Sequence, residues 1–326
     1  MEAHRRLPIG DRLIDAAIVL LSLALVAWVG LIIAASGSTE DGGVAGVAAA
    51  PEVPGEPVGG GGPHAGWKLV WRDEFKEATC PSRAKWRFEH GFVRNGELQW
   101  YQPENANCHD GVLALEARRE EKRNPGYRPG STDWRLNRRV AGYTSASIAS
   151  KYSFTYGRAE ALIRIDPRPG SWQDFWMLGT SFRRKPNSWP ATGEVDIGEY
   201  YRNLVLANVC NPKPSRCGWS STMQSLASLG GRAWASRFHL WAMDWNAKRI
   251  ELFLDGKLVH RFAVADAARA GRRNPYVDQP AFLLLSQALG GANGGNPGST
   301  EFPVRLEVRY VRVYQRTGDQ GRRAPE

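Results

Sequence analysis

The sequence predicts an all-β protein built as a single antiparallel sandwich. From about Trp67 to Gln315, short alternating or apolar segments rich in Val, Ile, Leu, Phe, Tyr and Trp are separated by Gly, Pro, Asn and Asp. Long segments with helical periodicity are absent, and strands do not alternate with helices as they do in parallel α/β folds. A barrel would share these features, and we favour the sandwich.

Nine segments are the better strand candidates. Most of them alternate polar and apolar residues, as a strand with one buried face does. Asp255 and Gly256 indicate a tight hairpin, because both central positions of that turn favour positive φ. The candidates are 68–75, 112–118, 159–165, 193–201, 204–210, 238–245, 250–254, 281–289 and 305–314.

The N-terminal segment, 1–36, predicts membrane targeting. Residues 16–35 carry no charge and are long enough to cross a bilayer as a helix. Three arginines precede this run and two acidic residues follow it, which places the N-terminus in the cytoplasm and the rest of the chain outside. We expect an exported protein held at the outer side of the membrane by this anchor, or a secreted one if the run is a cleaved signal. The charged residues are Arg5, Arg6, Arg12, Glu40 and Asp41.

The remaining boundaries follow from composition. Residues 37–65 are dominated by Gly, Ala, Pro and Val and are too poor in large apolar residues to form a core, so they predict a flexible tether. We expect the folded domain at 66–317 and a short tail at 318–326.

The chain carries a formal net charge of +10 and 13 Trp residues. A basic protein attracts polyanions, but the arginines are scattered and no nucleic-acid-binding motif surrounds them. We therefore expect a solvated basic surface and no nucleic-acid partner. Tryptophans in excess of core needs often line sites for flat, partly apolar ligands such as sugar rings.

Four cysteines in an exported chain predict disulfides rather than metal or redox chemistry. Cys210 and Cys217 bracket a short loop with two prolines, so we pair them, which leaves Cys80 with Cys108. No spacing resembles a zinc site.

Three carboxylates in the stretch GEVDIGE carry the functional prediction. Glu194 and Asp196 are two apart and project from one face of a strand, and a one-residue bulge at Ile197 or Gly198 would bring Glu199 to the same face. Like charges in such a row repel, so stability explains them poorly. Glycoside hydrolysis explains them well, because a retaining enzyme needs an ionised carboxylate and a protonated one about 5–5.5 Å apart. An edge strand with solvated acids is the alternative.

These residues resemble the signature of glycoside hydrolase family 16, an E-x-D-x-x-E run on a strand that lines the substrate cleft. The resemblance covers nearly all of the chain after the tether, in the family's order. It rests on LVWRDEF (69–75), NGELQWY (95–101), YGRAEALIRI (156–165), SWQDFWMLG (171–179), WPATGEVDIGEY (189–200), FHLWAMDW (238–245), FLDGKLV (253–259), QALGG (287–291) and VRYVRVYQ (308–315).

The resemblance implies a jelly-roll sandwich of two curved antiparallel sheets with an open concave cleft. It also implies retaining cleavage of internal bonds in β-linked glucans or galactans. Carried over by position, Glu194 matches the nucleophile, Asp196 the assisting acid and Glu199 the general acid/base.

Further residues are candidates for substrate binding. Trp172 and Trp176 are four apart on one strand face and resemble the two tryptophans of the family's WPAFW block; we expect Trp176 to stack on a sugar, with a core role as the alternative. Asn95 and Glu97 resemble a pair that borders the donor side of the cleft, although a turn Asn and a surface Glu would look the same. The amides of the set could instead satisfy backbone groups. The full set is Trp172, Trp176, Trp189, Asn95, Glu97, Asn208 and Gln287.

Three positions depart from the family pattern. Gly198 stands where Met is common, which removes a side chain near the site. Arg309 stands where many members have an Asp of a structural calcium site, which leaves calcium binding doubtful. QDF in SWQDFWM replaces PAF. We expect no required cofactor.

The sequence thus predicts a monomeric, retaining endo-β-glucanase whose partners are a polysaccharide and, through its N-terminus, the membrane. The expected substrate is β-1,3-glucan or mixed β-1,3/1,4-glucan. The alternatives are a galactan hydrolase acting on agar or carrageenan, a catalytically silent glycan-binding module, and a transglycosylase.

Overall fold

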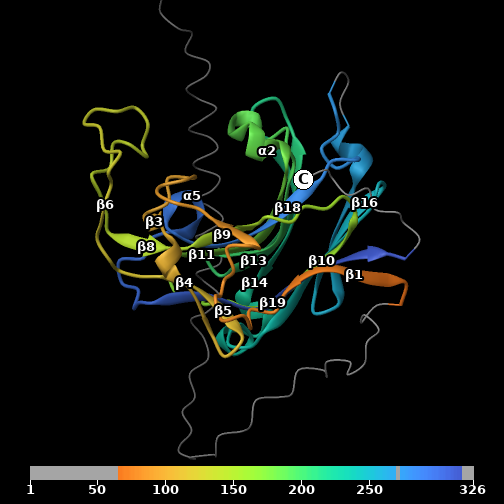
Figure 1. The fold of residues 1–326 in the computed structure, drawn as a ribbon, viewed down its shortest axis with the longest axis horizontal. Coiled ribbons are helices and arrows are strands. Elements are labelled where there is room, and N and C mark those ends of the chain that lie inside the picture. The colour runs from red at the N-terminus through yellow and green to blue at the C-terminus, as the bar shows by residue number, and fades with distance from the viewer. Residues whose placement is uncertain (1–64, 269–271, 318–326) are drawn as a thin grey trace, which may run out of the picture. The chain divides into compact units, whose positions relative to one another are not determined.

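Two antiparallel sheets pack face to face, as the sequence predicts (Figure 1). The structure, a computed structural model, describes residues 65–268 and 272–317. The predicted anchor at 1–36, all but the last residue of the tether at 37–65, and the tail at 318–326 lie outside the described residues. Within the described ranges, no helix is long and apolar enough to span a bilayer.

One sheet of eight strands forms the face opposite the functional site. Its long strand β19 (Val304–Arg316) pairs with β10 along one edge and with both β5 and β1 along the other. The order in the described chain is β17 (Lys257–Ala263), β16 (Arg249–Leu254), β15 (His239–Trp245), β10 (Gly157–Arg164), β19, β5 (Val112–Ala117) and β4 (Ala106–His109), with β1 (Trp67–Asp73) beside β19.

The second sheet, of seven strands, carries the site. Its order is β14 (Cys217–Ser225), β13 (Leu204–Pro212), β12 (Glu194–Tyr201), β11 (Ser171–Gly179), β18 (Ala281–Leu289), β9 (Ser147–Ser150) and β2 (Trp86–Phe88). Two small ribbons join β3 (Gln99–Tyr101) to β8 (Tyr143–Ser145) and β6 (Lys122–Arg123) to β7 (Val140–Ala141).

The described helices are single turns. They are α2 (Ser181–Arg184), α3 (Leu226–Leu229), α4 (Gly231–Ala235) and α5 (Gly291–Gly294), with the 3₁₀ turns η1 (Pro103–Asn105), η2 (Pro186–Ser188) and η3 (Val264–Ala267). The prediction that long helices are absent is therefore confirmed for this part of the chain.

All nine predicted strands are present. The hairpin between β16 and β17 turns at Asp255 (φ 49°) and Gly256 (φ 76°), the two positive values that such a turn requires. Two disulfides, Cys80–Cys108 and Cys210–Cys217, join the cysteines as paired from the sequence.

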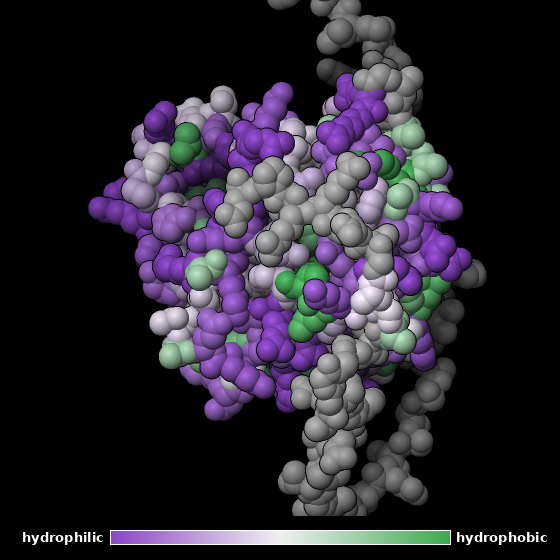
Figure 2. All heavy atoms as spheres, turned by 45° about the vertical axis from the view of Figure 1, so that its right-hand side comes forward, coloured by the Kyte–Doolittle hydropathy of each residue, from purple (hydrophilic) through white to green (hydrophobic). Residues whose placement is uncertain are grey.

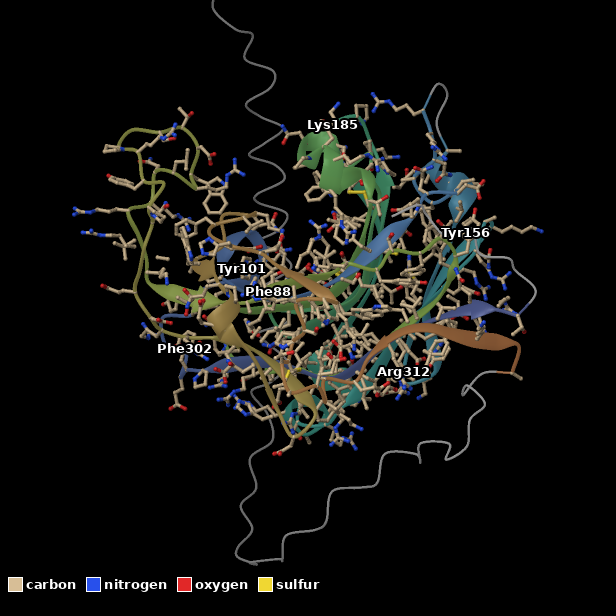
Figure 3. All side chains as sticks on the ribbon, viewed as in Figure 1. Phe88, Tyr101, Tyr156, Lys185, Phe302 and Arg312 are labelled. Atoms are coloured by element: carbon tan, nitrogen blue, oxygen red, sulfur yellow. A yellow bond between two sulfur atoms is a disulfide. The ribbon has the colours of Figure 1, made fainter. Side chains whose placement is uncertain are left out.

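The core lies between the two large sheets. Side chains from both layers fill this space (Figure 3), and large aromatic residues such as Trp86, Tyr200 and Trp245 are almost completely buried in it. The surface seen in Figure 2 is mostly hydrophilic with separate hydrophobic patches. Burial of one face of each sheet thus leaves the other face of the seven-stranded sheet free for function.

Candidate active site

The three predicted carboxylates lie on the face of β12 that points away from the core. Val195 and Tyr200 belong to the inter-sheet core. Since side chains alternate along a strand, Glu194 and Asp196 project from the opposite face. Asp196 is 4% exposed and Glu199 is 5% exposed, whereas Glu194 is only partly buried.

Glu199 reaches that face through a β-bulge. Between Asp196 and Glu199, two residues of β12 oppose the single residue Ala207 of β13. A Cβ added to Gly198 would lie 1.1 Å from a ring atom of Trp241. The side chain missing at Gly198 would therefore point into the core rather than toward the carboxylates.

Asn208 and Trp172 hold two of the carboxylates. The side-chain nitrogen of Asn208 donates to Asp196 Oδ2 at 3.0 Å and to Glu199 Oε2 at 2.8 Å. Trp172 Nε1 donates to the other oxygen of Glu199 at 2.6 Å. These donors fix the orientation of both acids and favour their ionised forms.

Glu194 accepts hydrogen bonds at both its side chain and its main chain. Trp189 Nε1 donates to its carboxylate, and the Tyr276 hydroxyl lies 2.9 Å from its carbonyl oxygen. The preceding residue, Gly193, has φ 77°, and a Cβ there would lie 2.8 Å from Pro275. Glycine is therefore needed to start β12 at the first carboxylate.

Burial sets the protonation of this group. Desolvation raises the pKa of Glu194 to about 7, partly offset by the Trp189 donor. Desolvation also raises the pKa of Glu199 to about 7, and the nearby charge of Glu194 raises it further. The pKa of Asp196 is well above its usual range through burial and both glutamates. Near pH 7 the group therefore shares protons, the condition in which one acid attacks while another donates.

Of the three predicted tryptophans, Trp172 and Trp176 are buried and only Trp189 has an exposed ring. Trp172 is 8% exposed, and its ring nitrogen is committed to Glu199. Trp176 is 5% exposed, donates to Ser286, and has the Arg94 guanidinium 5.0 Å above its ring. The sugar-stacking surface predicted for Trp176 is thus covered by Arg94. Trp189 is 39% exposed and keeps ring surface available beside Glu194.

Asn95 and Glu97 are placed differently from each other. Asn95 is exposed, in a turn with φ 56°. Glu97 is 3% exposed and accepts a hydrogen bond from Gln99 at 2.7 Å, so it is not a surface residue. Burial raises the pKa of Glu97, while Arg94 lowers it.

The two amide residues predicted to contact the sugar, Asn208 and Gln287, lie in different environments. Asn208 lies among the carboxylates as described. Gln287 is fully buried and bonded to Gln173, and it has the opposite parity on β18 to Ser286, which contacts Trp176. The prediction of a sugar contact at Gln287 is not supported by this position.

Three residues of this face were not predicted. Arg94 is one of 43 basic residues, and nothing in its sequence neighbourhood distinguishes it. Trp219 and Met223 in β14 are 45% and 60% exposed. They share the side of Ser221, which pairs with Asn208, so alternation along CGWSSTMQS could have found them.

Asp174 in β11 was also not predicted as a site residue. It is opposite Glu199 of β12 and is therefore a fourth carboxyl on this face. It replaces the Ala of PAF, and this substitution was the available signal.

The position of the family's calcium-site Asp does not fit a calcium ligand in this chain. Arg309 places a guanidinium 4.6 Å from the ring of Phe238 instead. Within residues 65–268 and 272–317, no group of three or more His, Cys, Asp or Glu side chains is arranged to hold a metal ion.

The fold and the site define a class: a β-sandwich protein with a row of carboxylates on one strand of the seven-stranded sheet. A model of Glycosyl hydrolases family 16 matches residues 97–303, and the chain belongs to this family. It is a glycoside hydrolase, and the predicted jelly-roll sandwich is confirmed.

Proteins similar to this chain include a β-glucanase and a laminarinase. A β-glucanase from Rhodothermus marinus is 33% identical, over 78% of this chain and 86% of that protein. The laminarinase catalytic domain from Thermotoga maritima has a TM-score of 0.65 at 29% identity, covering 77% of this chain and 99% of that one. A structure from a study of endo-acting O-glycanases, with which human gut bacteria initiate mucin breakdown, has a TM-score of 0.69 at 29% identity, covering 78% and 92%.

Proposed function

We propose that this protein is a retaining endo-glycosidase that cleaves β-1,3-glucan or mixed β-1,3/1,4-glucan. The observation that carries the proposal is the arrangement of Glu194 and Glu199, which share one face on either side of Asp196 and have separate hydrogen-bond donors. Relatives that act on β-glucans support the substrate class.

The chemistry follows in two steps. Glu194, ionised and oriented by the Trp189 N–H, attacks the anomeric carbon while protonated Glu199 gives its proton to the leaving oxygen. Glu199 then takes a proton from water, which attacks the glycosyl ester and releases Glu194. Asp196, bonded to Asn208, lies between the two glutamates, and by sharing protons with them it helps to keep Glu199 protonated until the first step.

A galactan is the second candidate substrate. The net charge of +10 would favour a sulfated galactan, because a basic protein concentrates acidic polymers. The O-glycanase structure, with the higher TM-score, also supports a substrate other than glucan.

The proposal includes a site of action outside the cytoplasm. The two disulfides support it, because such bonds persist in oxidising compartments.

Digestion of laminarin, lichenan, agarose and carrageenan, followed by sizing of the products, tests the proposal. We expect short oligosaccharides from the first two substrates and a Glu194→Gln variant without activity. Cleavage of the galactans alone would favour the second candidate. Binding without cleavage by the unmodified protein would indicate a glycan-binding module.

A further inference from the structure

Asp174 lies on the site face of β11, and within the described residues its Oδ1 has no hydrogen-bond partner. Its strand neighbours two positions away, Trp172 and Trp176, both turn their ring nitrogens to polar groups of this face. In register, Asp174 is opposite Glu199 on one side and Ser286 on the other. Its carboxyl group therefore stands beside the proposed acid/base.

The hydrogen bonding of Asp174 differs from that of the other three acids. Glu194, Asp196 and Glu199 each accept at least one hydrogen bond from Trp or Asn. No described residue donates to the carboxyl group of Asp174, although its Oδ1 is buried. A buried acceptor without a donor is unfavourable, because nothing compensates its removal from water.

The protonation state of Asp174 depends on the charges that surround it. The charged groups that act on Asp174 are the three carboxylates of β12 and the Arg94 guanidinium, while β18 contributes the uncharged Ser286. Three acids outnumber one base, and each of the acids has donors that stabilise its ion. Because no described residue donates a hydrogen bond to its buried Oδ1, Asp174 binds a proton of its own, in addition to the proton that the mechanism places on Glu199. Desolvation and the neighbouring acids indeed raise its pKa well above the usual range.

We propose that Asp174 is a substrate-contacting residue, held as a neutral carboxylic acid, that exchanges hydrogen bonds with a hydroxyl of the sugar bound beside Glu199. This inference rests on the proposed function. A neutral acid both donates and accepts, as a sugar hydroxyl does, so the pair satisfies Asp174 without adding another negative charge to the site. It is a binding role, separate from the proton transfers of Glu194 and Glu199.

The decisive comparison is Asp174→Asn against Asp174→Ala. An amide has nearly the shape of a protonated carboxyl group and also donates and accepts, so the Asn variant should keep kcat/KM within about threefold, with the same pH profile. The Ala variant should lose about 10–100-fold in kcat/KM, the cost of one buried hydroxyl contact. Asp110→Asn, an exposed turn residue of the other sheet, is the matched control and should change nothing.

Infrared spectroscopy reads the proton directly. The unliganded protein near pH 7 should show protonated-carboxyl stretches, of which one component is missing in Asp174→Asn and none is missing in Asp110→Asn. Thermal unfolding of each variant checks that it is folded.

The outcomes separate the two proposals. An active protein whose Asp174→Ala variant is equally active overturns the sugar contact. An Asn variant whose alkaline limb moves to lower pH shows that Asp174 acts as a charge on Glu199, which overturns the neutral form. An infrared spectrum that Asp174→Asn leaves unchanged also overturns it. If the unmodified protein cleaves none of the four polysaccharides yet loses one infrared component in Asp174→Asn, the proposed function fails and the protonated Asp174 stands.

Discussion

At the residue scale, each of the two glutamates accepts a hydrogen bond from the ring nitrogen of a different tryptophan. Trp189 donates to Glu194 and Trp172 donates to Glu199, so two tryptophans that resemble sugar platforms in the sequence hold acids in the structure. Each donor favours the ion of its own acid, while burial opposes ionisation of both. The balance between these effects determines the pH at which the site works.

Trp172→Phe removes one donor and keeps the ring. Without the N–H, the ionised form of Glu199 loses stabilisation, so its pKa rises and the alkaline limb of the kcat/KM profile should move to higher pH. kcat should fall, because Glu199 also loses its orientation. Trp86→Phe removes a buried N–H that donates to Asp73, and this control should leave the profile in place. An unchanged limb in Trp172→Phe would contradict the assigned role.

At the element scale, the bulge in β12 brings Glu199 to the same face as Glu194 and Asp196, although its position in the sequence has the opposite parity. It requires Gly198, because Trp241 of β15 fills the space behind it. The bulge therefore couples the position of Glu199 to packing between the sheets.

Gly198→Ala should be destabilising by about 1–3 kcal/mol, the usual cost of overpacking a core. It should also lower kcat by displacing Glu199. Urea unfolding and kinetics on the same preparation measure both effects. Gly142→Ala, with no atom within 4 Å of the added Cβ, is the matched control. Wild-type stability in Gly198→Ala would show that the ring of Trp241 is not a fixed obstacle.

The edge strand β14 extends the same face. Trp219 lies two strands from β12, about 10 Å at the usual strand spacing, with its side chain on the side of Asn208. We expect Trp219→Ala to raise KM for long glucans about three- to tenfold, through loss of a stacking contact, and to leave short substrates unaffected. Leu258→Ala, equally exposed on the other sheet, controls for loss of apolar surface. Equal effects on long and short substrates would argue against a remote sugar contact.

At the scale of the whole molecule, the nine strands and the bulge were predictable from local signals. These signals are period-two alternation and the wrong parity of Glu199 directly after a glycine. β14 was missed because Ser and Thr dominate it at a sheet edge. Gln287 was predicted to contact a sugar, but it is fully buried. Alternation along a strand shows which residues share a face, but it does not show which of the two faces lies against the core. The donors to Glu194 and Glu199 come from other segments, so only the fold reveals them.

The carboxylate group also imposes a stability cost on the molecule. Glu199 has a folded-state pKa of about 7 and an ordinary value of 4.5, so above pH 4.5 the unfolded chain binds fewer protons and stability falls until about pH 7. Glu199→Gln should remove part of this loss, making the protein about 1–3 kcal/mol more stable at pH 8 and little changed at pH 4. Urea unfolding at the two pH values measures it, and an equal gain at both would show that the cause is not ionisation.

The most direct test of the central claim is to trap the glycosyl-enzyme. A Glu199→Ala variant, given an aryl β-laminaribioside with a good leaving group, can form the covalent intermediate without acid assistance but hydrolyses it slowly. Mass spectrometry should find the protein heavier by one laminaribiosyl group, and peptide mapping should place that group on Glu194. An adduct on another residue, or release of the aryl group with no adduct at any time, would contradict the assignment of Glu194 as the nucleophile.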